Sequence, residues 1–163
     1  MLRRAAVILT LVMTLPTCGF QMRGSQSINV VNISSLDLRS ATADELAREV
    51  KTQLQLAGVT ITSKADYTLS LEHENYDRSV LSISPRTGKA EEFQLTLTAR
   101  MSLAKVDGTD LINNELISVS HDYLFDEDAL LGKAAEESVL KANLRRQAAA
   151  TILRRVHATT QAN

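Results

Sequence analysis

An uninterrupted alternation of apolar and polar residues from position 93 to 103 constrains the fold of this chain more than any other feature. Successive side chains of a strand lie on opposite faces of a sheet, so a period of two indicates a strand with one buried face. Such a strand needs paired neighbours, and its apolar face needs a covering layer. The apolar positions are Phe93, Leu95, Leu97, Ala99, Met101 and Leu103.

Three other segments are predicted to be strands. Residues 27–38 form a β-branched run, residues 67–71 alternate and continue less regularly to 83, and residues 117–125 alternate again. Turn residues at 85–88 and an Asp-Gly pair at 107–108 separate the last three strands. We therefore expect roughly four strands.

A first helix is predicted between residues 43 and 57, where apolar residues recur every three or four positions. Thr42 and Glu45 fit a capping box, in which each side chain bonds an amide at the other position. Gly58 is expected to end the helix in a left-handed conformation.

A second helix is predicted to begin at a cap on Asp126 or Asp128 and to run to about His157. We expect residues 158–163 to lie beyond it as a frayed end. Its predicted inner stripe consists of Leu130, Ala134, Leu140, Leu144, Ala148, Ile152 and Val156.

These elements predict an α+β fold. Because the long strands have one polar face, the sheet needs covering on one side, and two apolar helix stripes are available for it. The expected architecture is a two-layer sandwich in which two helices pack on one face of a roughly four-stranded mixed sheet. Leu54 and Leu97, each in the middle of its stripe, are expected to face each other. At 163 residues, the chain has room for a single core of this kind.

The N-terminus has the composition of an export signal. Arg3 and Arg4 precede an uncharged stretch at 5–15, which is too short to span a bilayer. Residues 15–18, Leu-Pro-Thr-Cys, resemble a bacterial lipobox, in which the cysteine becomes the lipidated first residue of the mature protein. We predict a signal peptide at 1–17 and one domain at 18–163. The alternative is an ordinary secretory signal followed by a free thiol at Cys18.

Signatures of catalysis, metal binding and nucleic-acid binding are missing from the sequence. A formal net charge of -1 provides no global positive field for a nucleic acid. The three histidines, His73, His121 and His157, have no metal-ligand spacing, and one cysteine cannot form a cysteine-rich metal site. No nucleophile elbow or phosphate-binding loop occurs. We predict no catalytic residues, no metal and no cofactor apart from the lipid on Cys18.

Several segments in order are similar to the LptE family of outer-membrane lipoproteins that assemble lipopolysaccharide. They are the Cys-Gly-Phe-Gln-Met-Arg-Gly run at 18–24, the helix ending in Leu-x-x-x-Gly-Val at 54–59, the Arg-x-Gly-Lys-Ala-Glu-Glu-Phe segment at 86–93, and Tyr123 before an acidic loop. A closing helix with Ile-Leu-Arg-Arg at 152–155 completes the pattern.

The resemblance implies a protein held on the inner leaflet of the outer membrane by its lipid anchor. Gly19, in place of the aspartate that retains lipoproteins in the inner membrane, agrees with that location. The family implies a plug inside the β-barrel of the partner LptD, whose assembly it supports, and direct contact with lipopolysaccharide. The Ser/Thr-rich sheet face would suit the wet lumen of a large barrel, although a plain solvated surface would look the same. The alternative is another outer-membrane lipoprotein adaptor that does not bind lipopolysaccharide.

Four cations are candidate lipopolysaccharide contacts. In the family resemblance, Arg86 and Lys133 match basic positions associated with such contact, and Lys89 and Arg100 are secondary candidates. Arginine suits this role because its planar guanidinium makes bidentate contacts with phosphate. The alternative is that these residues are solvated charges that serve solubility.

Overall fold

The computed structural model describes residues 33–124 and 133–162 and confirms the α+β class. The elements in order are β1 (Ser35–Ser40), α2 (Asp44–Leu56), β2 (Thr60–Ile61), β3 (Tyr67–Ile83), β4 (Ala90–Lys105), β5 (Asp110–Leu124) and α3 (Lys133–Gln161). Among the described residues the sheet has five strands in the order β2-β1-β3-β4-β5. The two-residue strand β2 accounts for the difference from the four strands predicted.

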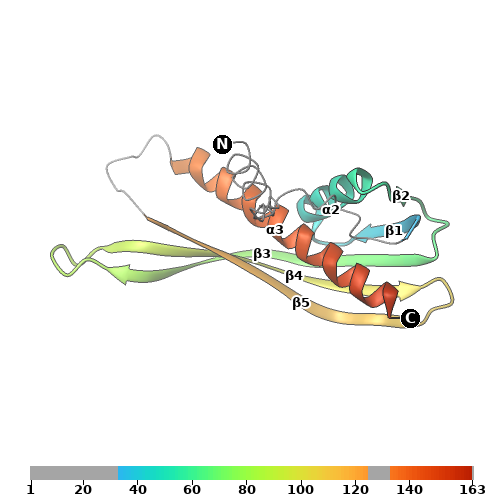
Figure 1. The fold of residues 1–163 in the computed structure, drawn as a ribbon. Coiled ribbons are helices and arrows are strands. Elements are labelled where there is room, and N and C mark those ends of the chain that lie inside the picture. Colours follow the sequence, from blue (N-terminus) through green and yellow to red (C-terminus); the bar gives the residue numbers. More distant parts are fainter. Residues whose placement is uncertain (1–32, 125–132, 163) are drawn as a thin grey trace, which may run out of the picture.

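The sheet is mixed, as predicted. β1 runs parallel to both β2 and β3, whereas β3, β4 and β5 are antiparallel neighbours joined by hairpins. Both helices lie on one face, as Figure 1 shows. In β4 the apolar positions from 95 to 103 are buried, whereas the polar positions between them are partly or fully exposed. The prediction of a strand with one buried face is therefore confirmed for β4.

The two helices divide the buried face between them. α2 packs on β1, β2 and β3, while α3 packs on β4, β5 and α2. Leu54 and Leu97 are both fully buried in one core, but the described α2 does not pack on β4. α3 is the helix with close backbone contacts to the strand of Leu97, and the prediction that these two leucines face each other stays a prediction.

The first strand ends later in the chain than predicted. Within the described residues, β1 covers 35–40 and so ends two residues past the predicted end at 38, while the predicted part at 27–32 lies outside the described residues. Its position follows from parallel pairing with β3, in which Leu38 is opposite Leu69. A partner so distant in sequence leaves no trace in the local alternation.

The predicted capping box does not form at the start of α2. Ala43 occupies the N-cap position without a side-chain hydrogen bond, because the Thr42 hydroxyl accepts the backbone N–H of His73 at 2.8 Å instead. The other end matches the prediction. Gly58 has φ +84°, its N–H donates to Gln55 O, and the Val59 N–H donates to Leu54 O. This pair of bonds is a Schellman motif.

β5 begins at Asp110, seven residues before the predicted start. Ile112 and Ile117 are both buried although their spacing is odd, which a regular strand would place on opposite faces. A bulge around Asn114, with φ +52° and its N–H donating to Ser102 Oγ at 3.0 Å, restores the common face. The extra residue interrupts the alternation of apolar and polar residues, so the sequence pattern does not indicate the first half of the strand.

The predicted stripe of α3 is buried from Leu140 onward, through Leu144, Ala148, Ile152 and Val156. The predicted caps Asp126 and Asp128 lie outside the described residues. α3 continues to Gln161, four residues past the predicted end at His157, and the fraying predicted at 158–163 stays a prediction. The Thr160 hydroxyl donates to Val156 O at 2.9 Å in this last turn.

Beyond the helices, the β3–β4 hairpin projects from the body of the molecule (Figure 1). Residues 77–81 of β3 are all exposed, so both faces of the strand are uncovered there. The start of α3 lies at the same end of the molecule. Neither described helix is long and apolar enough to cross a bilayer.

Candidate functional site

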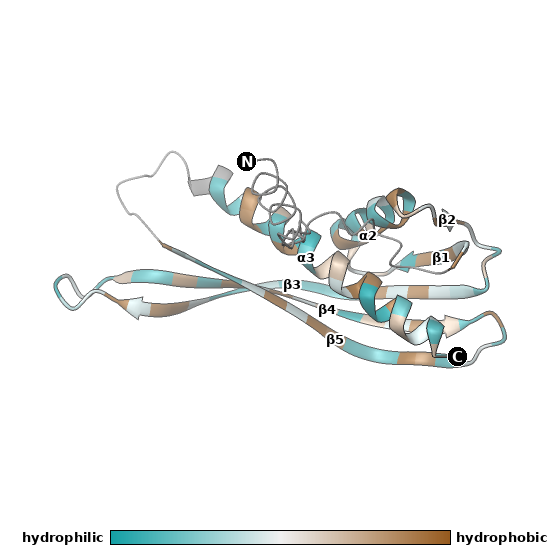
Figure 2. Cartoon of the chain, in the orientation of Figure 1, coloured by the Kyte–Doolittle hydropathy of each residue, from teal (hydrophilic) through white to brown (hydrophobic). Residues whose placement is uncertain are grey.

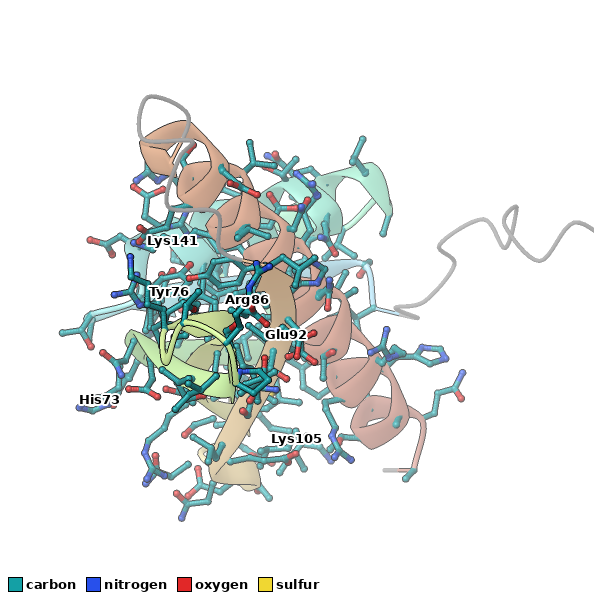
Figure 3. All side chains as sticks on the ribbon, turned by 90° about the vertical axis from the view of Figure 1, so that its left-hand side faces the viewer. His73, Tyr76, Arg86, Glu92, Lys105 and Lys141 are labelled. Atoms are coloured by element: carbon teal, nitrogen blue, oxygen red, sulfur yellow. The ribbon has the colours of Figure 1, made fainter. Side chains whose placement is uncertain are left out.

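The projecting hairpin ends in a tight turn that displays Arg86. The backbone N–H of Ser84 donates to Lys89 O at 2.8 Å, and the N–H of Gly88 donates back to Ser84 O at 2.8 Å. Gly88 has φ +72°, a conformation that glycine adopts without steric cost. Arg86 and Lys89 are both exposed on this turn. Figure 3 looks onto this end and shows Arg86 on the hairpin, with Tyr76 and Lys141 to one side of it.

Of the four candidate cations, Arg86, Lys89 and Lys133 lie at the hairpin end of the molecule, whereas Arg100 lies away from it. Lys133 is the first residue of α3, at the same end as the hairpin, although its side chain is not among those described. Arg100 lies ten residues after the first residue of β4, which is roughly 33 Å along a strand. Its Nη1 donates to Asn114 O at 3.2 Å, beside the β5 bulge. Arg100 therefore supports the sheet away from the hairpin end.

A polar junction that the sequence did not predict fixes both helices on the sheet. It is built at an irregularity of β3, where His73 has φ +56° and the register shifts between Glu72 and Asn75. The segment before α2 holds this irregularity. Thr42 accepts the His73 N–H on its hydroxyl and the Glu74 N–H, at 3.2 Å, on its carbonyl.

The Glu74 carboxylate then joins three elements. Its Oε1 accepts the Tyr76 hydroxyl and the Arg145 Nε, each at 2.9 Å, and its Oε2 accepts the backbone N–H of Leu46 at 2.9 Å. Leu46 lies in the first turn of α2, whose amides lack partners within the helix. Glu74 thus caps α2 from the sheet and pairs with α3. Its side chain is 8% exposed, and that of Arg145 is 23% exposed.

Cations from α3 flank the Tyr76 ring. Lys141 Nζ lies 5.3 Å from the ring centroid and Arg145 Cζ lies 5.5 Å from it. Burial, together with the hydrogen bond to Glu74, raises the pKa of the Tyr76 phenol well above its ordinary value. Lys141 also pairs with Glu137 at 2.7 Å and thereby lowers the pKa of that carboxyl. The junction thus fixes α3 to β3 at Lys141 and Arg145.

Sequence reasoning missed this junction for a physical reason. Glu74 and Arg145 are 71 positions apart, and a glutamate in an alternating strand is typical of an exposed position. The break in alternation after Leu71 was the one available signal. Among the described residues, no group of three or more histidines, cysteines, aspartates or glutamates is arranged to hold a metal ion.

A sequence profile described as LptE, Lipopolysaccharide-assembly, matches residues 26–156. The chain belongs to the LptE family. Two LPS-assembly lipoproteins of this name are similar to our LptE-family chain over most of its length. That of Photorhabdus laumondii is 30% identical over 143 residues, which cover 85% of this chain and 76% of the relative. That of Yersinia pestis is 31% identical over 154 residues, which cover 90% of this chain and 72% of the relative.

Solved structures agree with the LptE-family assignment. The crystal structure of rare lipoprotein B from Shewanella oneidensis has a TM-score of 0.68 and 31% identity, over 77% of this chain and 96% of that one. A solution structure of lipoprotein B from Nitrosomonas europaea has a TM-score of 0.72 at 22% identity, over 88% and 94% of the two chains. The second match supports the fold alone.

Proposed function

We propose that this LptE-family lipoprotein binds lipopolysaccharide at its hairpin end and sits inside the barrel of an LptD partner in the outer membrane. The observation that carries the proposal is the display of Arg86 on a closed, projecting turn at the same end as the start of α3, which bears Lys133. Phosphate groups of lipopolysaccharide suit such cations. The polar sheet face opposite the helices suits the water-filled lumen of a barrel.

The Arg86→Asp, Lys133→Asp double variant is expected to bind immobilised lipopolysaccharide at least about tenfold more weakly at physiological salt, because two attractive charges become repulsive. Lys51→Asp, a charge reversal at an exposed site on α2, is the matched control and should bind as wild type. Circular dichroism should be unchanged in both. Equal binding by the double variant and wild type would exclude these cations as the site.

The LptD partnership is tested separately. Affinity purification of the full-length lipoprotein from outer membranes is expected to recover a large β-barrel protein, in wild type and in the Arg86→Asp, Lys133→Asp variant alike. If a barrel is recovered but lipopolysaccharide binding is absent from wild type, the protein is an adaptor without a lipid site.

Cys18 is proposed as the membrane anchor, with residues 1–17 removed. Mass spectrometry of the mature N-terminus is expected to show a cysteine carrying more than one acyl chain, which gives stable anchoring where a single chain does not. Cleavage elsewhere or an unmodified thiol would contradict the proposal. Cys18→Ser is expected to leave the thermal unfolding midpoint of the domain unchanged, because the described core is complete without this residue.

A further inference from the structure

The buried face of the sheet continues past the end of its helical cover. On this face, rows of paired residues cross the three long strands: Tyr76 with Leu97 and Val119, then Arg78 with Leu95 and His121. The third row consists of Val80, Phe93 and Tyr123, which we call the terminal row. Phe93 has the same parity as the buried Leu95 and Leu97, so the terminal row lies on the helix-facing side.

Helix α3 covers the first of these rows but leaves the terminal row partly open. Lys141 and Arg145 lie over Tyr76 in the first row. The α3 side chains described before them, at 136–139, are all exposed, and burial begins at Leu140. Val80 is 51% exposed, while Phe93 and Tyr123 are partly exposed. Figure 2 shows hydrophobic segments continuing along the strands into this projecting end.

The terminal row is an ordered apolar surface. The rings of Phe93 and Tyr123 stack with centroids 5.9 Å apart, and these are two of the six aromatic residues of the whole chain. Large apolar side chains that are partly exposed favour contact with another apolar group. The row therefore has the properties of a binding surface.

Cations border this apolar surface. The Arg78 guanidinium lies 5.1 Å from the centroid of the Phe93 ring, and Arg86 is displayed at the turn that closes the same two strands. By strand alternation, Asp77, Glu92 and Asp122 lie on the opposite face of the sheet, whereas Glu91 shares the face of Phe93. An apolar row bordered by guanidinium groups is complementary to a ligand that has hydrocarbon chains next to phosphates.

We propose that the terminal row binds acyl chains of lipopolysaccharide while the hairpin cations bind its phosphates. This inference rests on the proposed function, because it assigns the acyl chains of lipopolysaccharide to the terminal row and its phosphates to the hairpin cations. It adds an apolar half to a site so far defined by its charges. The occupant is a hydrocarbon chain of the same molecule whose phosphates meet Arg86.

Binding of intact and fully deacylated lipopolysaccharide by the full-length lipoprotein, in one detergent throughout, tests the proposal. Val80→Asn, which removes the apolar contact without adding a charge, is expected to weaken binding of the intact lipid at least about tenfold and to leave binding of the deacylated form unchanged. Arg86→Asp should weaken both. Leu116→Asn is the matched control, since Leu116 is 56% exposed and lies on the opposite sheet face, paired with Arg100. It should bind as wild type.

A fluorescence measurement gives an independent readout. The chain contains no tryptophan, so Phe93→Trp introduces a single indole into the terminal row. Its emission is expected to shift to shorter wavelength with the intact lipid and to stay unchanged with the deacylated form. If wild type binds the lipid but Val80→Asn binds equally well and the indole emission does not move, the terminal row is not the acyl site. If wild type binds no lipopolysaccharide, the proposed function fails first.

Discussion

Replacing Leu97 by alanine is expected to lower the free energy of unfolding by about 2 to 5 kcal/mol, because the substitution removes buried methyl groups and leaves a cavity. Leu97 is fully buried in the middle of β4, the strand on which α3 packs. Its strand is paired on both sides, with Tyr76 and Val119 opposite Leu97, so the site cannot readily collapse around a smaller residue. Urea denaturation followed by circular dichroism measures the change.

The neighbouring position provides the control for Leu97. Thr96 is only partly buried and lies on the opposite face of the same strand, so Thr96→Ala is expected to change stability by no more than about 0.5 kcal/mol. A similar loss at both positions would mean that both faces of β4 are covered, which would contradict a two-layer sandwich.

Replacing Glu74 by alanine is expected to destabilise the protein by about 3 kcal/mol, because it removes the nearer carboxylate of Arg145 in a partly buried site and leaves only Glu45, at 4.0 Å. The same change removes the acceptor for the Leu46 N–H and for the Tyr76 hydroxyl. Three elements lose a common contact, so the effect should exceed that of an ordinary surface ion pair. Thermal and urea unfolding both measure it.

Glu72 is the matched control for Glu74, two positions earlier on β3. Its side chain is 48% exposed and lies 3.8 Å from His73, so Glu72→Ala is expected to cost no more than about 0.5 kcal/mol. In a double-mutant cycle, Glu74→Ala and Arg145→Met should be strongly non-additive. Additive effects, or equal losses at Glu72 and Glu74, would show that the junction does not hold the helices.

The hairpin end depends on this junction. The Tyr76 ring, the Lys141 ammonium and the Glu74 carboxylate together set where α3 leaves the sheet. Because α3 starts at the same end as the Arg86 turn, its placement determines whether cations from two elements can act on one ligand. The junction is therefore a positioning element for the proposed site, and Glu74→Ala should weaken lipopolysaccharide binding through α3.

Local pattern determined the parts of this protein whose cause is local. The period of two in β4 and the apolar stripe from Leu140 to Val156 in α3 each indicate which face of the element is buried. Each buried position must be apolar, so the sequence of the element itself carries the pattern. The Schellman motif at Gly58 needs only bonds within six residues. The tight turn at Gly88 is equally local.

Tertiary structure alone decided the features that depend on partners far away in sequence. The Thr42 hydroxyl could cap its own helix, but it accepts the His73 N–H across 31 positions instead. Irregularities near His73 in β3 and at Asn114 in β5 change which side chains of these strands lie on the buried face. The bounds of β1 are set by its parallel pairing with β3. The physical reason is that hydrogen-bond donors and acceptors compete for partners throughout the folded chain, whereas periodicity records only which side of each element meets the core.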